Sequence, residues 1–382
     1  MRVVLMLFAL GLVVLACGKK EPFTIVEVDE PKFVENTAFK AFEDLTSPRF
    51  PAFREKYQLD TVFRGEEDEF KRMLLLRDWI RTVINIGDFE DSYPGDNYAD
   101  RIIDAGLQGQ GFHCGHYMIV QNAVMNSYGY LTRCLGAGPG VKGGPDGHHG
   151  INEIWSNKFH KWFLSDAKYN HHFEKDGIPL SALEIRDEYL KNKAADIVLV
   201  KGTERKPIES DGVADKNGKM IQLTKERFAQ TYTWIEWESG NNRFTDWPEP
   251  GDAIDHLNMF ADDYFKNNTW IWDNKPHWAY KTEFMIPVED RKAFEWTPNT
   301  VKADVKIEGE KVIVKLHSTT PNLKSYQMKL SSEKEWTDVK DSLEIKLEND
   351  RNELSFRTVN LAGVAGEPSK IVVARGRVEV RI

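Results

Sequence analysis

A cysteine, a histidine and an aspartate that could form a nucleophilic site occur in one stretch of this chain. Cys114 closes the segment 109-GQGFHC-114 and directly precedes an amphipathic run over residues 115–130. A helix beginning there favours a thiolate, because a helix N-terminus carries partial positive charge. A thiolate nucleophile also needs a base and a group that orients the base. His149 and Asp166 supply those two residue types farther along the chain.

Two predicted strands position the histidine and the aspartate. The segments 151-INEIW-155 and 161-KWFLSDAKY-169 read as strands, and 156-SNKFH-160 reads as the turn between them. His149 precedes the first strand, and Asp166 lies near the end of the second. A hairpin of this kind can bring the two side chains together. Residues 68–84 and 115–130 have apolar residues at helical spacing and predict two helices.

These segments resemble the transglutaminase-like superfamily over about residues 65–185. Three pairs of residues match its motifs: Gly111 with Cys114, His149 with Glu153, and Trp162 with Asp166. The resemblance implies an α+β fold with a papain-like core, in which helices pack on an antiparallel sheet. It also implies that Cys114 is the nucleophile, His149 the base and Asp166 the orienting carboxylate.

The chain departs from the family pattern at two positions. Ile151 stands where the family's His-x-Trp-x-Glu strand has a tryptophan. His148 precedes His149, so either could be the base, but only one of two adjacent strand residues faces the cysteine. The spacing to Glu153 favours His149.

The groups that would stabilise an oxyanion are less specific in the sequence. The backbone N–H of Cys114 is one candidate donor. By analogy with papain-like enzymes, the side chain of Gln108 or of Gln110 could be the second. Both glutamines could equally be solvated loop residues.

The first twenty residues, MRVVLMLFALGLVVLACGKK, predict a targeting segment. Arg2 precedes an apolar run over residues 3–16, which is too short for a comfortable membrane span. The run ends in VLAC followed by Gly18, which resembles a bacterial lipobox. Residues 1–17 are therefore predicted to be a lipoprotein signal peptide, with a lipid on Cys17 that anchors an extracytoplasmic protein to a bacterial membrane, on the periplasmic side or at the cell surface. The alternative is an ordinary signal peptide with an incidental cysteine.

The remaining chain divides into four predicted parts. Residues 18–45 read as a tether, 46–185 as the core and 186–297 as a tryptophan-rich extension of it. Short alternating strands over residues 298–382 predict a β-sandwich of the immunoglobulin or fibronectin III type. The tryptophans of the extension could form a stacking platform for sugars or peptides, but they more often fill a core.

Composition disfavours several partners. The formal net charge is -9 and no basic face is evident, so no nucleic-acid partner is expected. Adjacent histidines on a strand point to opposite faces, so the histidine pairs predict no metal site. No cofactor is expected either. Cys134 follows GYLTR and reads as a core residue that enters a buried strand. The alternative, a disulfide to Cys114, would disable the nucleophile.

Two functional classes follow from the sequence. The first is thiol-dependent acyl transfer on an amide or peptide through a thioester on Cys114, with hydrolysis favoured over cross-linking and a protein, peptide or cell-wall substrate. The second is a non-catalytic module that binds a cell-surface peptide or glycan and carries a relic triad. The reactivity of the cysteine separates the two.

Overall fold

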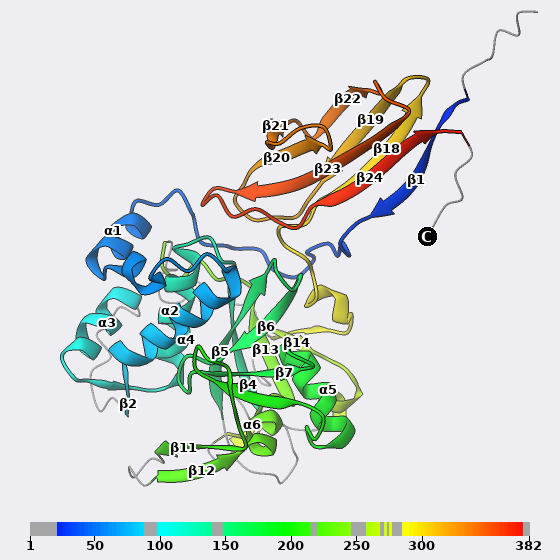
Figure 1. Cartoon of the computed structure of the whole chain (residues 1–382). Helices are drawn as coiled ribbons and strands as arrows, with labels where there is room; N and C mark the ends of the chain where they lie inside the picture. Colours follow the sequence, from blue (N-terminus) through cyan, green and yellow to red (C-terminus); the bar gives the residue numbers. More distant parts are fainter. Residues whose placement is uncertain are drawn as a thin grey trace, which may run out of the picture.

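A computed structural model describes most of the chain, namely residues 21–87, 98–139, 148–214, 220–245, 257–267, 271–272, 275–276 and 285–376. It is elongated, with a mixed helix–sheet core at one end and a β-sandwich at the other (Figure 1). Cys17 and residues 377–382, the last part of the predicted sandwich, lie outside the described residues. No helix in the described part of the chain is long and apolar enough to cross a membrane.

The core is built on a six-stranded sheet in the order β17-β14-β13-β4-β5-β6. Neighbouring strands are antiparallel except β14 and β17, which are parallel. The strand bounds are β4 Thr132–Gly138, β5 His149–Ser156, β6 Lys161–Ser165, β13 Trp234–Glu238, β14 Leu257–Phe260 and β17 Met285–Val288. The predicted hairpin is present, with Trp155 opposite Trp162.

Helices cover the two faces of this sheet in two groups (Figure 1). Helices α1 to α4 pack with Ile154 and Phe163 on one face of the sheet. Helices α5 and α6 pack with Ile151 and Trp155 on the other face. Side-chain alternation along the strands therefore separates two apolar cores. The helix bounds are α1 Arg49–Lys56, α2 Glu69–Val83, α3 Ala99–Leu107, α4 Cys114–Asn126, α5 Ala182–Asn192, α6 Lys225–Thr231 and α7 Asp263–Asn267; two 3-10 turns are Leu59–Phe63 and Arg291–Ala293.

The two predicted helices begin close to where the sequence places them. Asp68 caps α2, because its side chain accepts a hydrogen bond from the N–H of Lys71 at 3.0 Å. Met73, Leu76 and Ile80 on its apolar face are fully buried. The helix predicted at 115–130 is α4, which begins one residue earlier, at Cys114, and ends at Asn126.

Several short strands surround the core sheet. One four-stranded sheet has the order β10-β9-β7-β8, and the others are two-stranded ribbons. Their bounds are β2 Asn85–Ile86, β3 Gly111–Phe112, β7 His171–Lys175, β8 Ile178–Pro179, β9 Val198–Lys201, β10 Lys206–Ile208, β11 Ser210–Ala214, β12 Met220–Thr224, β15 Ile271–Trp272 and β16 Lys275–Pro276.

The β-sandwich packs a five-stranded sheet, β1-β24-β23-β20-β21, against a three-stranded sheet, β18-β19-β22. Alternate residues of β19, including Val312 and Val314, are buried against Phe356 and Val373 of the other sheet. The strand bounds are β1 Phe23–Asp29, β18 Lys302–Glu308, β19 Lys311–His317, β20 Leu323–Leu330, β21 Thr337–Val339, β22 Ser342–Lys346, β23 Arg351–Asn360 and β24 Ser369–Arg375.

The N-terminal lead differs from the predicted organisation. Residues 18–45 are not simply a tether, because Phe23–Asp29 forms the edge strand β1 and pairs with β24 of the sandwich. Residues 186–297, predicted as an extension of the core, contribute β13, β14 and β17 to the core sheet. Trp234 and Trp237 in this region are buried, so they serve as core residues rather than as an exposed platform.

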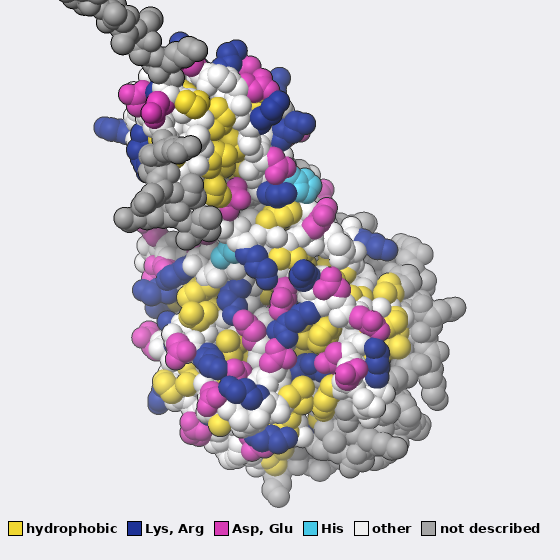
Figure 2. Space-filling view, turned by 90° about the vertical axis from the view of Figure 1, so that its right-hand side faces the viewer, with side chains coloured by type: hydrophobic (Ala, Val, Ile, Leu, Met, Phe, Trp, Pro, Cys, Tyr) yellow, Lys and Arg dark blue, Asp and Glu magenta, His cyan; other side chains and the backbone are white. Residues whose placement is uncertain are grey.

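Charged side chains of both signs are intermixed over the face of the molecule shown in Figure 2. A band of hydrophobic side chains runs along the sandwich in the same view. Mixed charges of this kind keep a surface hydrated without creating a large field of one sign.

A buried carboxyl in the core sheet predicts a pH-dependent stability. Burial, together with the charge of Glu238, raises the pKa of Glu236 from 4.5 to about 8. A carboxyl whose pKa is raised on folding stabilises the fold at low pH and loses that contribution as the pH rises through about 8. We expect the free energy of unfolding to fall by about 1–2 kcal/mol between about pH 6.5 and 8.5.

The same measurement on Glu236→Gln provides the control. Denaturant titrations of this variant should show a flatter dependence on pH over the same interval, because the titrating group is gone. Equal slopes for the two proteins would contradict the assignment.

Candidate functional site

The start of α4 presents Cys114 at the edge of the core. Cys114 is the first residue of the helix and is partly exposed. His113 caps the helix, since its Nδ1 accepts a hydrogen bond from the N–H of Gly115 at 3.2 Å. The N–H of Cys114 has no acceptor within the helix, as for the first residues of any helix. It is therefore free to face an acyl oxygen.

His149 and Asp166 are held together beside this helix. His149 Nε2 lies 2.7 Å from Asp166 Oδ2, and both residues are buried. His149 opens β5, and Asp166 directly follows β6. The contact with Asp166 identifies His149, rather than His148, as the histidine that a carboxylate orients.

Tyr169 completes the support of this pair and was not singled out from the sequence. Its N–H donates to Asp166 Oδ1 at 3.1 Å, and its ring stacks on His149 with centroids 5.5 Å apart. One carboxylate oxygen is thus fixed by the backbone while the other faces the imidazole. The only sequence signal was the position of an aromatic residue three places after Asp166.

Two glycines allow β5 to approach the start of α4. A Cβ at Gly150 would lie 3.2 Å from Gly115 Cα and 3.6 Å from the carbonyl carbon of Cys114. The first distance is tighter than nine in ten contacts of real Cβ atoms and the second is an ordinary van der Waals contact, so the strand and the helix lie close through their backbones. This approach places the residue next to Gly150 in the chain, His149, against the cysteine.

The electrostatics of the three groups favour an ion pair. Burial raises the pKa of Cys114, but hydrogen bonds with His113, His148 and His149, together with the charge of His149, hold it well below the ordinary value. Burial also opposes the charged form of His149, but the charge of Asp166 and the hydrogen bonds to Asp166 and Cys114 raise its pKa to about 9. Burial raises the pKa of Asp166, but the charge and hydrogen bond of His149, together with His171, hold it well below its ordinary value.

This arrangement can carry out nucleophilic chemistry near neutral pH. Since the pKa of the thiol lies low and that of the imidazole lies high, the thiolate–imidazolium form is populated between them. The thiolate is the nucleophilic form, and the imidazolium can donate a proton to a leaving group.

A buried arginine braces the loop that carries Asp166. Arg77 of α2 is fully buried; its Nε donates to Asn170 Oδ1 and its Nη1 to the carbonyl of His171, each at 3.0 Å. The same carbonyl also accepts from the N–H of Asp166 at 3.1 Å. Burial lowers the pKa of Arg77 to about 10, and the negative charge of Asp166 limits that decrease.

The sequence analysis did not single out Arg77, although a signal was present. It lies four residues after Met73 and three before Ile80, in the apolar stripe of the helix at 68–84. A charged residue in such a stripe indicates a buried partner.

The glutamines proposed for the oxyanion hole lie in the turn before β3. The side chains of Gln108 and Gln110 are both exposed. The backbone N–H of each donates to the carbonyl of Ala105 at 3.1 Å. Their role stays a prediction. Gly111 contacts the protein rather than an open cleft, because a Cβ there would lie 2.8 Å from Gly87 Cα.

Cys134 and Glu153 are both buried in the core. Cys134 is fully buried and, like Cys114, is a free thiol; burial raises its pKa well above the ordinary value. Glu153 is buried against Arg133, with Oε2 2.7 Å from Nη2, and it also accepts from Trp237 Nε1 at 2.8 Å. No group of three or more His, Cys, Asp or Glu in the described ranges is arranged to hold a metal ion.

Comparisons with known proteins give similarity to solved structures but no sequence match. No protein-family model matches the chain, and no curated protein matches it in sequence. Among solved structures, red sea bream transglutaminase aligns with a TM-score of 0.27 and 11% identity, over 86% of this chain and 57% of that one. The chain thus spans little more than half the length of that transglutaminase.

A substitution at Gly150 tests the approach of strand and helix. Valine there would push the start of α4 away from β5, so we expect alkylation of Cys114 at about pH 6 to slow at least tenfold. Alanine should have a smaller effect. The rate is measured with iodoacetamide, using peptide mass spectrometry to assign the modified cysteine.

Ile151→Val on the same strand is the matched control. Ile151 faces the apolar core that packs with α5 and α6. Its replacement by valine should lower the free energy of unfolding by about 0.5–1.5 kcal/mol without changing the alkylation rate. If Gly150→Val alkylates as fast as the unsubstituted protein, the glycine contact does not set the distance between the thiol and the imidazole.

Proposed function

We propose that this chain is an extracytoplasmic cysteine hydrolase or acyltransferase with a papain-like core of the transglutaminase type. The observation that carries the proposal is the buried contact of 2.7 Å between His149 and Asp166, next to a helix-start cysteine of low pKa. Burial of His149 and Asp166 around one polar contact is costly unless it serves such chemistry. The expected substrate is an amide or a peptide bond.

The first half of the reaction forms a thioester. The thiolate of Cys114 attacks the carbonyl carbon, and the backbone N–H of Cys114 stabilises the oxyanion. The imidazolium of His149 gives its proton to the amine nitrogen, and the C–N bond breaks. Asp166 keeps the imidazole oriented and stabilises its charged form throughout.

The second half releases the acyl group. His149, now neutral, takes a proton from water, whose oxygen attacks the thioester; the C–S bond breaks and the thiolate–imidazolium pair is restored. The products are a carboxylic acid and an amine, and the cycle needs no cofactor. An amine in place of water would give a cross-link, but we favour hydrolysis because water is abundant outside the cell.

The proposed location follows from the N-terminal sequence. A lipid on Cys17 would anchor the protein to a bacterial membrane, facing the periplasm or the cell surface. Its substrates would then be proteins, peptides or cell-wall peptides. The sandwich, which we place in the immunoglobulin or fibronectin III class, would be a spacer or adhesion module.

The test compares the protein with Cys114→Ser on a panel of peptide and side-chain amides, with and without a fluorescent primary amine. Release of an acid and an amine that depends on Cys114 supports hydrolysis. Incorporation of the fluorescent amine instead identifies a cross-linker. If neither occurs and both proteins bind a cell-wall peptide equally, the cleft is a binding module and the enzymatic proposal fails.

A further inference from the structure

The outer end of the sandwich gathers the beginning and the end of the described chain. Phe23 of β1 pairs with Arg375 of β24. Arg375 Nη1 also donates to the carbonyl of Glu21 at 3.2 Å, and the N–H of Gly376 donates to the carbonyl of Pro22 at 3.2 Å. The chain is therefore fixed to the sandwich from residue 21 onward. Residues 18–20 alone separate Cys17 from this fixed point, a reach of roughly 15 Å.

The core attaches at the opposite end of the same sheet. Strand β23 begins at Arg351, which pairs with Ala374 near the outer end, and it finishes at Asn360. Asn360 Nδ2 donates to the carbonyl of Gly129 in the core at 3.0 Å. The 10 residues of β23 span roughly 30 Å.

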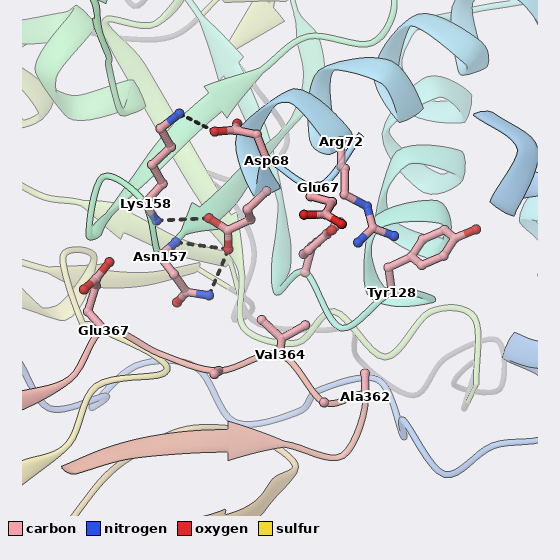
Figure 3. Close-up of a pocket in the computed structure, with 13 residues that line it drawn as sticks. Glu67, Asp68, Arg72, Tyr128, Asn157, Lys158, Ala362, Val364 and Glu367 are labelled. Atoms are coloured by element: carbon pink, nitrogen blue, oxygen red, sulfur yellow. Dashed lines mark hydrogen bonds and ion pairs between the residues drawn. The ribbon is translucent and has the colours of Figure 1, made fainter. Parts of the chain in front are cut away.

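The core and the sandwich are packed tightly at this junction, which we call the joint. A Cβ on Gly129 would lie 2.5 Å from Ala362, and one on Gly366 would lie 1.6 Å from the carbonyl oxygen of Asn299. A polar cavity of about 660 Å³ lies beside the joint, lined by the α2 start and by the sandwich loop that carries Ala362 (Figure 3).

Cys114 lies at the far side of the core from this joint. Helix α4 has 13 residues; it begins at Cys114 and ends at Asn126, close to Gly129 and the sandwich. Its length is roughly 20 Å. Strand β3, just before Cys114, pairs with β2, and Figure 1 shows β2 at the end of the core away from the sandwich. The lengths of the strand and the helix add up to roughly 50 Å, which is the greatest distance that they can place between Cys114 and the outer end of the sandwich.

The outer end is a polar surface. Arg375 pairs there with Glu310 at 2.6 Å and with Asp350 at 3.0 Å, and the carboxylate of Asp350 is 86% exposed. A surface of this kind stays hydrated and does not insert into the apolar part of a bilayer.

We propose that the sandwich is a stalk that stands with its outer end on the membrane and holds Cys114 away from the lipid surface, by up to roughly 50 Å. The proposal rests on lipidation of Cys17 and on the proposed chemistry of Cys114. It implies that the substrate is a protein or a cell-wall polymer reached away from the bilayer. Lipids and membrane-embedded segments lie out of reach.

The test uses the full-length, lipidated protein in phosphatidylcholine vesicles that carry a short-range quencher on the headgroups. One sample has a fluorophore on Cys114, with the buried Cys134 unlabelled. The second has Cys114→Ser and Asp350→Cys, labelled at the outer end. We expect quenching at position 350 to exceed quenching at 114 at least fivefold.

Each other outcome identifies what fails. If the protein does not bind the vesicles, and Cys17→Ser leaves vesicle binding unchanged, the lipid anchor is absent. The stalk is then overturned, whereas the proposed chemistry of Cys114 is unaffected. Equal quenching at both positions means that the core rests on the bilayer, which overturns the stalk while the anchor stands. Activity on amides is measured separately on the unlabelled lipidated protein with Cys114 intact, so loss of the proposed function is distinguishable from either result.

Discussion

Replacing His149 with alanine is expected to slow alkylation of Cys114 at about pH 6 by at least tenfold. In the folded protein the imidazolium of His149, paired with Asp166 at 2.7 Å, keeps the thiol ionised. Without it, a thiol near the ordinary pKa of about 8.5 would be roughly 0.3% ionised at that pH. A more basic thiolate is intrinsically more nucleophilic, which offsets part of this loss.

The neighbouring histidine provides the matched control. His148→Ala removes one hydrogen bond to the thiol but leaves the contact between His149 and Asp166 intact. We expect a smaller decrease in rate and an unchanged profile above neutral pH. A larger loss in His148→Ala than in His149→Ala would mean that the base has been misassigned.

Replacing Glu153 with glutamine is expected to lower the free energy of unfolding by about 3–5 kcal/mol. Glu153 and Arg133 are both buried, and their contact of 2.7 Å is the only compensation of either charge by an ion pair in the described structure. Glutamine keeps the shape and the acceptor for Trp237 Nε1 but leaves a buried cation without its counterion. Denaturant titration measures the change.

The double variant Arg133→Met with Glu153→Gln separates charge from shape. It should be more stable than Glu153→Gln alone, because no uncompensated charge remains in the core. Alkylation of Cys114 in the folded single variant should be unchanged. A double variant as unstable as the sum of the two single variants would show that the ion pair itself is not what stabilises this region.

Much of the candidate site could be predicted from the sequence because it depends on local patterns. The apolar spacing before Ile84 and the run after Cys114 define α2 and α4, and the alternation in 151–165 defines the hairpin. The choice between His148 and His149 follows from strand alternation once Asp166 is placed beside them.

Other features depend on contacts between distant segments and left little local signal. Strand β1 reads as a charged lead, and only its pairing with β24 at the other end of the chain makes it a strand. The role of Gly150 depends on its distance from Gly115. The brace from Arg77 likewise appears only when α2 packs on the loop after β6.

The ionisation of Cys114 tests the central claim most directly. The ultraviolet absorbance of the thiolate is followed from about pH 4 to pH 10 in the protein and in Cys114→Ser, and the difference isolates this one thiol. We expect the thiolate to be present already at about pH 6, with a further change as His149 loses its proton near pH 9. A single transition near the ordinary value of about 8.5 would contradict the account, because the thiol would then have no imidazolium partner.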